Sequence, residues 1–151
     1  MKILVRSLVV ILACLQVHAK QEKRPNVVVV LCDDLGYGDL ACYGHPVIQT
    51  PNLDKFAQQG MRFTQSYSAC GVCSPSRSSI LTGRTPYRNG VWRWIPGGPQ
   101  VHLRTSEITS AELLKEKGYE TCHVGKWHLN GKFNSKDQPQ PDAHGFDHWM
   151  A

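Results

Sequence analysis

Residues that can bind an anion, hold a metal or move a proton occur in three short stretches of this 151-residue chain. The stretches are Asp33-Asp34, Cys73-Ser74-Pro75-Ser76-Arg77 and Lys126-Trp127-His128. Each follows a predicted strand or opens a predicted helix. We therefore expect the three stretches to converge on one rim of a sheet, where ligands of open α/β sheets bind.

The first stretch follows Asn26–Cys32, a β-branched apolar run without alternation. Such a run predicts a strand buried on both faces. Two free carboxylates at Asp33 and Asp34 would repel each other at the end of this strand. A hard divalent cation, Ca²⁺ or Mg²⁺, resolves the repulsion because both ions prefer oxygen ligands. A solvated turn is the simpler interpretation of an Asp-Asp pair taken alone.

The second stretch places Cys73 at or just before a predicted helix over residues 74–83. Unpaired N–H groups and the helix dipole favour negative charge there. Arg77 lies one turn along, so its side chain can reach back to residue 73. The site suits an anion or an oxyanion nucleophile. A buried structural cysteine and a redox pair with Cys70 are alternatives, but neither explains Pro75 or Arg77.

The third stretch, Lys126 and His128, follows a predicted strand over Tyr119–Val124. A histidine suits proton transfer near neutral pH. Taken alone, the pair is an exposed lysine beside a structural histidine, and Trp127 is expected to pack. The remaining candidates, His45 and His123, have no matched partner and are expected in core or surface roles.

The elements that must position these residues alternate between strands and helices, which predicts an α/β fold. Thr50 is the expected N-cap of a helix that begins at Pro51 and stops at Gly60. Thr109 and Glu112 form a predicted capping box for the next helix, which stops at Gly118. A further strand is expected over residues 61–67, and residues 130–145 are expected to be loop.

The N-terminus has the pattern of a signal peptide over residues 1–19. Lys2 and Arg6 precede the apolar run Leu8–Ala13, which is too short to span a bilayer, and Ala19 ends the cleavage site. We expect export, either periplasmic or secreted, with no transmembrane span after cleavage. An uncleaved anchor and a lipoprotein site at Cys14 are the alternatives.

Charge and cysteine content narrow the function classes. Cleavage after Ala19 leaves 15 basic and 12 acidic residues, a net charge of +3. This charge is too mild to favour nucleic acid. If Cys73 is modified, the four cysteines beyond the signal that remain are enough for two disulfides in an oxidising compartment. They are Cys32, Cys42, Cys70 and Cys122.

The order Cys73-x-Pro75-x-Arg77, followed by Leu-Thr-Gly-Arg, resembles the signature of type I sulfatases. Asp33-Asp34 and Gly-Lys-Trp-His are similar to other stretches of that family. Residues 44–54 and His-Gly-Phe-Asp are similar to arylsulfatases and N-acetylgalactosamine-6-sulfatases. The resemblance covers about residues 24–150 and only the N-terminal portion of the family. It implies an alkaline-phosphatase-like sandwich with a largely parallel sheet covered by helices, of which residues 20–151 are a truncated N-terminal part.

The resemblance also implies a reaction. Cys73 would be oxidised by a formylglycine-generating enzyme to formylglycine (3-oxoalanine), whose hydrate is the nucleophile. Asp33, Asp34 and residue 73 would bind Ca²⁺, with Mg²⁺ as the alternative. Arg77 joins the catalytic set, Lys126 would bind the sulfate and the formylglycine, and His128 would hydrogen-bond the second hydroxyl. The function is then a sulfuric ester hydrolase acting on a sulfated small molecule or glycan.

Two other functions remain open at this point. A phosphatase or phosphodiesterase of the same superfold usually carries Thr or Ser as nucleophile, which Cys73-x-Pro75-x-Arg77 argues against. A non-catalytic remnant that binds anions or partners is favoured by the chain length, because the family draws further metal ligands from beyond residue 151. Residues that follow the signature are candidates to shape a substrate pocket. They are Arg84, Arg88, Asn89, Trp92 and Trp94.

Overall fold

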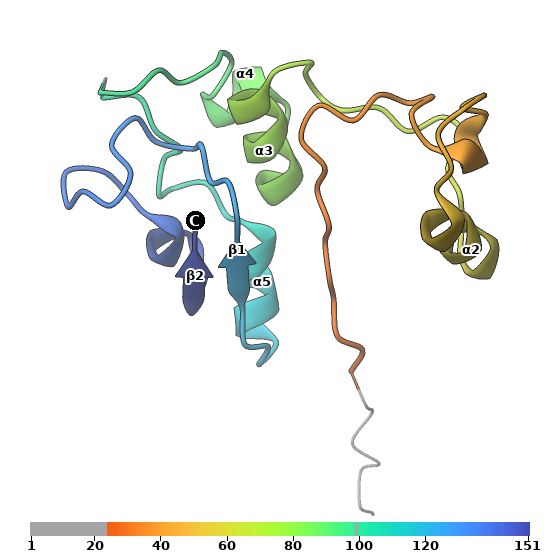
Figure 1. Cartoon of the computed structure of the whole chain (residues 1–151). Helices are drawn as coiled ribbons and strands as arrows, with labels where there is room; N and C mark the ends of the chain where they lie inside the picture. Colours follow the sequence, from red (N-terminus) through yellow and green to blue (C-terminus); the bar gives the residue numbers. More distant parts are fainter. Residues whose placement is uncertain (1–23, 99) are drawn as a thin grey trace, which may run out of the picture. The chain divides into compact units, whose positions relative to one another are not determined.

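The computed structural model of the chain describes residues 24–98 and 100–151 (Figure 1). These residues belong to two units, one ending at Cys32 and the other spanning Asp33–Ala151. The predicted signal peptide and Cys14 lie outside the described residues. Within the described ranges, no helix has the length and apolar character needed to cross a membrane.

The predicted strand over Asn26–Cys32 is wrong for this structure, because these residues form no strand. Their apolar side chains are exposed, with Val28 at 82% and Val30 at 83%. An unalternating apolar run becomes a buried strand only when other strands pair with it and helices cover both faces. The described part of the chain provides no strand partner for this run.

The helices that the structure describes lie in the second unit. They are the 3-10 helices η1 (Ala41–Tyr43) and η2 (Pro141–His144), and the α-helices α2 (Pro51–Gln59), α3 (Cys73–Thr82), α4 (Pro86–Asn89) and α5 (Ser110–Glu116). The predicted start of α2 at Pro51 is confirmed. Thr50 does not cap it with its side chain; its Oγ1 donates to Asp54 Oδ1 at 2.8 Å instead.

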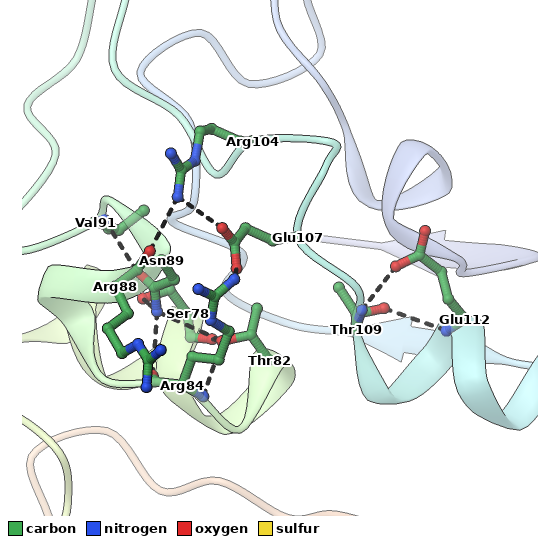
Figure 2. Close-up of polar contacts among 10 residues, drawn as sticks. All are labelled: Ser78, Thr82, Arg84, Arg88, Asn89, Val91, Arg104, Glu107, Thr109 and Glu112. Atoms are coloured by element: carbon green, nitrogen blue, oxygen red, sulfur yellow. Dashed lines mark hydrogen bonds and ion pairs between the residues drawn. The ribbon is translucent and has the colours of Figure 1, made fainter.

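The capping box of α5 is confirmed in full. Thr109 Oγ1 accepts a hydrogen bond from the Glu112 N–H, and the Glu112 carboxylate accepts one from the Thr109 N–H (Figure 2). The strand predicted over residues 61–67 is wrong, because these residues are irregular and exposed. Alternation alone does not form a strand when no neighbouring strand accepts its hydrogen bonds.

Two short parallel strands form the sheet that is present. β1 (Cys122–Val124) pairs with β2 (His148–Met150), with His123 opposite Trp149. The predicted strand over Tyr119–Val124 therefore exists only at its carboxyl end. The chain leaves β1 at Gly125, and this loop carries Lys126 and His128. The parallel order agrees with the expected α/β class.

The hydrophobic core lies beside this loop. Its buried members are Val91, Ile95, Leu103, Ala111, Trp127, Leu129 and Phe146. Trp127 and Leu129 flank His128 and are 3% and 1% exposed. Burial of such side chains contributes about 1.5–3 kcal/mol each. The core therefore anchors the backbone on both sides of His128.

A buried polar network joins α3 to α4 (Figure 2). Asn89 is fully buried, and its amide nitrogen donates to Ser78 Oγ at 3.0 Å and to the Arg84 carbonyl at 3.3 Å. The buried Glu107 carboxylate accepts from Arg84 at 2.8 Å and from Arg104 at 2.6 Å. An unpaired buried polar group costs free energy, and pairing of this kind removes that cost. The network fixes the orientation of α3, which carries Cys73.

The cysteines that the structure describes are all free thiols, including Cys32, Cys42, Cys70 and Cys122. The two disulfides that the sequence allowed are therefore absent from the described residues. A disulfide needs two Cβ atoms about 3.5–4.5 Å apart with matching directions, and even numbers of cysteines do not ensure that geometry.

Candidate functional site

Helix α3 begins at Cys73, one residue before the predicted start. The N-cap residue is Val72, whose side chain provides no capping hydrogen bond. Pro75 lies in the first turn, where its missing N–H costs no helical hydrogen bond. Cys73 is half-buried, whereas Ser74 and Pro75 are buried. The sulfur atom of Cys73 therefore lies at the uncapped, positive end of a helix.

The adjacent carboxylates of Asp33 and Asp34 gather beside this thiol. Asp34 has a left-handed backbone with φ of 57°. In an extended chain, neighbouring side chains point to opposite sides; the left-handed residue breaks that alternation. One carboxylate oxygen of each aspartate and the Cys73 Sγ lie within 4.8 Å of one another. These are the three residues that the sequence predicted as metal ligands.

Two cations hold the Asp33 carboxylate. Lys126 Nζ donates to Oδ2 at 2.8 Å and Arg77 Nη2 donates to Oδ1 at 3.1 Å. The hydrogen bond from Lys126, followed by that from Arg77, lowers the pKa of Asp33 below its ordinary value. The same hydrogen bond raises the pKa of Lys126. Asp33 is therefore ionised and Lys126 charged throughout the neutral pH range.

Lys126 also contacts the thiol. Its Nζ lies 3.4 Å from Cys73 Sγ, and the same Sγ lies 3.9 Å from Asp33 Oδ1. Residues 33, 73 and 126 are far apart in sequence, yet their functional atoms form one cluster. An anion next to residue 73 would therefore face the ammonium of Lys126.

Arg77 has a different contact from the one expected. Its side chain is 11% exposed, and Nη1 donates to the Lys126 carbonyl at 2.7 Å while Nη2 binds Asp33. Among the described contacts none joins Arg77 to Cys73. The guanidinium is a planar group with several donors. Here it hydrogen-bonds the loop of Lys126 and the loop of Asp33 at the same time and so holds the two loops together.

His128 lies two residues after Lys126 in the same loop. Its backbone is left-handed with φ of 55°, and its Nε2 lies 2.9 Å from the Ile95 carbonyl oxygen. Its Nδ1 is buried without a hydrogen-bond partner. The Trp94 ring meets the imidazole edge-on at 5.5 Å. The structure describes no hydrogen bond between His128 and Cys73, Lys126 or Asp33.

The other sequence candidates have local contacts. His45 Nδ1 accepts from the Val47 and Ile48 N–H groups, and the His123 ring lies against Trp127 at 5.2 Å. Burial lowers the pKa of His123. Both histidines have the structural roles that the sequence predicted.

The contact between Ser74 and Ile95 was not predictable from the sequence. Ser74 is fully buried, and its Oγ accepts from the Ile95 N–H at 3.2 Å. No sequence signal marks Ile95, because the contact uses its backbone. Of the pocket candidates, Arg84 and Asn89 belong to the network that orients α3, whereas Trp92 and Trp94 are about half exposed.

Residues 25–151 match the protein family described as Sulfatase. The chain is 43% identical to human steryl-sulfatase over 136 residues, which cover 85% of this chain and 23% of that protein. It is 44% identical to rat N-acetylgalactosamine-6-sulfatase over 135 residues, which cover 84% of this chain and 25% of that protein.

Solved structures give the same result. The PsFucS1 sulfatase from Pseudoalteromonas sp. superposes with a TM-score of 0.73 at 39% identity and covers 93% of this chain and 28% of its own. BT4656, solved with its substrate D-glucosamine-2-N,6-O-disulfate, superposes at 0.67 with 38% identity, over 84% of this chain and 23% of its own. The chain thus spans about a quarter of the length of its relatives, and it has the fold of the corresponding part.

Proposed function

This chain belongs to the sulfatase family, and we propose that the protein carrying it hydrolyses sulfate monoesters at residue 73. One observation carries the proposal. Lys126 Nζ lies 3.4 Å from Cys73 Sγ and 2.8 Å from Asp33 Oδ2. The ammonium of Lys126 therefore contacts both the residue that the family oxidises and a carboxylate suited to binding a metal. Cleavage of an anionic ester needs such positive charge beside the nucleophile.

We further propose that Cys73 is converted to formylglycine and that Asp33 and Asp34 hold a divalent cation. Ca²⁺ and Mg²⁺ bind oxygen and avoid thiol sulfur. The Sγ within 4.8 Å of both carboxylates marks where an oxygen of the modified residue would lie. Oxidation thus turns a mixed donor set into an all-oxygen one. One hydroxyl of the hydrated aldehyde would attack the sulfate sulfur and displace the alcohol of the ester, and deprotonation of the second hydroxyl would re-form the aldehyde and expel sulfate.

Lys126 binds the sulfate in this proposal. Its pKa is raised, foremost by the Asp33 hydrogen bond, so the ammonium keeps its charge at neutral pH. Charge on the sulfate oxygens is stabilised by a cation that is already in place. Arg77 acts by positioning, because it holds the backbone of Lys126 and the carboxylate of Asp33 together.

The proposed substrates are sulfated glycans or small sulfated alcohols. The names of the relatives support this class: steryl-sulfatase and N-acetylgalactosamine-6-sulfatase act on esters of this kind. A formylglycine-generating enzyme is the partner that the modification needs. The basic and apolar N-terminal residues support export, which would bring the protein to extracellular or periplasmic substrates.

Mass spectrometry tests the modification directly. The chain is co-expressed with a formylglycine-generating enzyme, and the peptide containing Cys73 should lose about 18 Da as sulfur and two hydrogens are replaced by oxygen. Cys70 is the matched control, because it is a half-buried free thiol outside the motif and should stay alkylatable. A residue 73 that remains an alkylatable thiol in every copy would contradict the proposal.

Turnover tests the reaction. The protein that carries this chain, once converted, should hydrolyse a sulfate ester of N-acetylgalactosamine and lose this activity in the Cys73→Ala variant. The phosphate ester of the same sugar is the control for the phosphatase alternative. Hydrolysis of the phosphate but not the sulfate would favour that alternative. Binding of both esters without turnover by the converted protein would favour the non-catalytic one.

A further inference from the structure

The backbone of Ile95 connects the helix that carries Cys73 to the loop that carries His128. The Ile95 N–H donates to Ser74 Oγ at 3.2 Å, and the Ile95 carbonyl oxygen lies 2.9 Å from His128 Nε2. Ile95 is 1% exposed and Ser74 is fully buried. The peptide unit before Ile95 thus contacts the helix of Cys73, and the peptide unit after it contacts the loop of His128.

We propose that Ser74, through Ile95, fixes His128 as the Nε2–H tautomer with Nδ1 as its proton acceptor. A carbonyl oxygen can only accept a hydrogen bond. The ring nitrogen beside it must therefore carry hydrogen. In a neutral imidazole the other nitrogen is then bare. The assignment of this tautomer stands on geometry alone, and only its catalytic meaning rests on the proposed function.

The orientation of the ring is fixed as well as its tautomer. Trp94 meets the imidazole edge-on at 5.5 Å and an interplanar angle of 82°. The left-handed backbone at His128 costs of order 1 kcal/mol or more for a non-glycine residue. Burial of Trp127 and Leu129 on either side holds the chain in that conformation. A ring flip would break the hydrogen bond to Ile95, because it would place a ring carbon beside the carbonyl oxygen.

The free nitrogen is the functional end of the ring. Nδ1 is buried and has no hydrogen-bond partner. A buried acceptor without a partner is costly, and a hydroxyl of a reacting group can supply the missing hydrogen bond. In the proposed reaction, Nδ1 takes the proton of a hydroxyl on residue 73. The Nε2–H stays on the Ile95 carbonyl and the resulting imidazolium is stabilised by a charge-assisted hydrogen bond.

Nuclear magnetic resonance of the ¹⁵N-labelled chain tests the tautomer without any substrate. Long-range ¹H–¹⁵N correlation distinguishes a protonated ring nitrogen from a bare one, and the His128→Gln variant assigns the signals. For the neutral ring, we expect a protonated Nε2 and a bare Nδ1. A protonated Nδ1 in the unmodified chain would overturn the proposal before any further variant is made.

Variants of Ser74 test the positioning role. Loss of one hydrogen bond corresponds to about a fivefold change in an equilibrium, so Ser74→Ala should shift the tautomer ratio of His128 toward Nδ1–H by up to about fivefold. Ser74→Thr keeps the hydroxyl and should restore the wild-type ratio. Ser79→Ala is the matched control, because Ser79 is buried on the same helix and its Oγ has no partner. An unchanged ratio in Ser74→Ala would exclude the role.

Activity separates this inference from the proposed function. In the converted protein that carries this chain, Ser74→Ala should lower kcat with little change in KM, and Ser79→Ala should change neither. If wild type has the expected tautomer but no sulfatase activity, the positioning stands and the proposed reaction fails. If activity is present with equal kcat in both serine variants, the reaction stands and Ser74 is not a positioning residue.

Discussion

Substitution of Thr109 tests the contact between the start of α5 and η2. Thr109 is fully buried and uses its hydroxyl twice. Its Oγ1 accepts from the Glu112 N–H at 3.2 Å and donates to the His144 carbonyl at 2.7 Å. Thr109→Val keeps the shape of the side chain and removes both hydrogen bonds. The variant therefore measures the hydrogen bonds without creating a cavity.

The expected loss of stability follows from these two contacts. Removal of an N-cap hydroxyl costs about 1 kcal/mol, and a buried carbonyl left without its partner costs about 1–3 kcal/mol. We expect the free energy of unfolding to fall by about 3 kcal/mol, and Tm to fall by about 10 °C for a chain of this size.

Urea unfolding followed by tryptophan fluorescence measures this change. Trp127 reports on the region because its ring lies 5.6 Å from that of His144. Thr109→Ser keeps the hydroxyl and should lose less than about 1 kcal/mol. A Thr109→Val variant within about 0.5 kcal/mol of wild type would refute the role of the Thr109 hydroxyl in capping α5 and in holding it to η2.

Three further predictions concern charge. Burial is the main cause that lowers the pKa of His144 below 6.5 in the folded protein, so below pH 6.5 the unfolded chain binds more protons than the folded one. The contribution of neutral His144 to the free energy of unfolding is therefore complete above pH 6.5. It declines below that pH by up to about 1.4 kcal/mol per pH unit. His144→Leu should remove this slope in urea unfolding between about pH 7.5 and 5, whereas substitution of the exposed His148 by Gln should not. Glu107→Gln leaves two arginines without their buried carboxylate and should cost about 2 kcal/mol, measured as a lower Tm with the Asn89 network intact. Asp34→Asn should weaken Ca²⁺ binding in calorimetry of the converted chain without lowering Tm in the absence of Ca²⁺, and equal Ca²⁺ affinity would remove Asp34 from the metal site.

Local features of the fold were predictable from sequence. Pro51 at the start of α2 and the Thr109–Glu112 capping box lie where the pattern placed them. These signals act between residues at most four apart, so the chain alone determines them. The strands predicted over residues 26–32 and 61–67 failed for the opposite reason. A strand exists only through hydrogen bonds to a distant segment, which a local pattern does not contain.

The sequence by itself determined which residue types are available for chemistry. It identified the paired acids, the Cys73-x-Pro75-x-Arg77 order and the loop of Lys126 and His128, because these are local spacings that can be read directly. It also identified the family, which the comparison of residues 25–151 confirmed.

Only the tertiary structure decided how these residues meet. Arg77 binds Asp33 and the Lys126 carbonyl rather than reaching back to residue 73. His128 is tied to Ile95, whose contribution is a backbone carbonyl that every residue possesses. These contacts and the ion pair of Lys126 with Asp33 join residues that are separated by 33 to 93 positions in the sequence, and they depend on how α3 and the loop after β1 pack on the shared core. Packing of that kind depends on many side chains together, and no short spacing in the sequence encodes it.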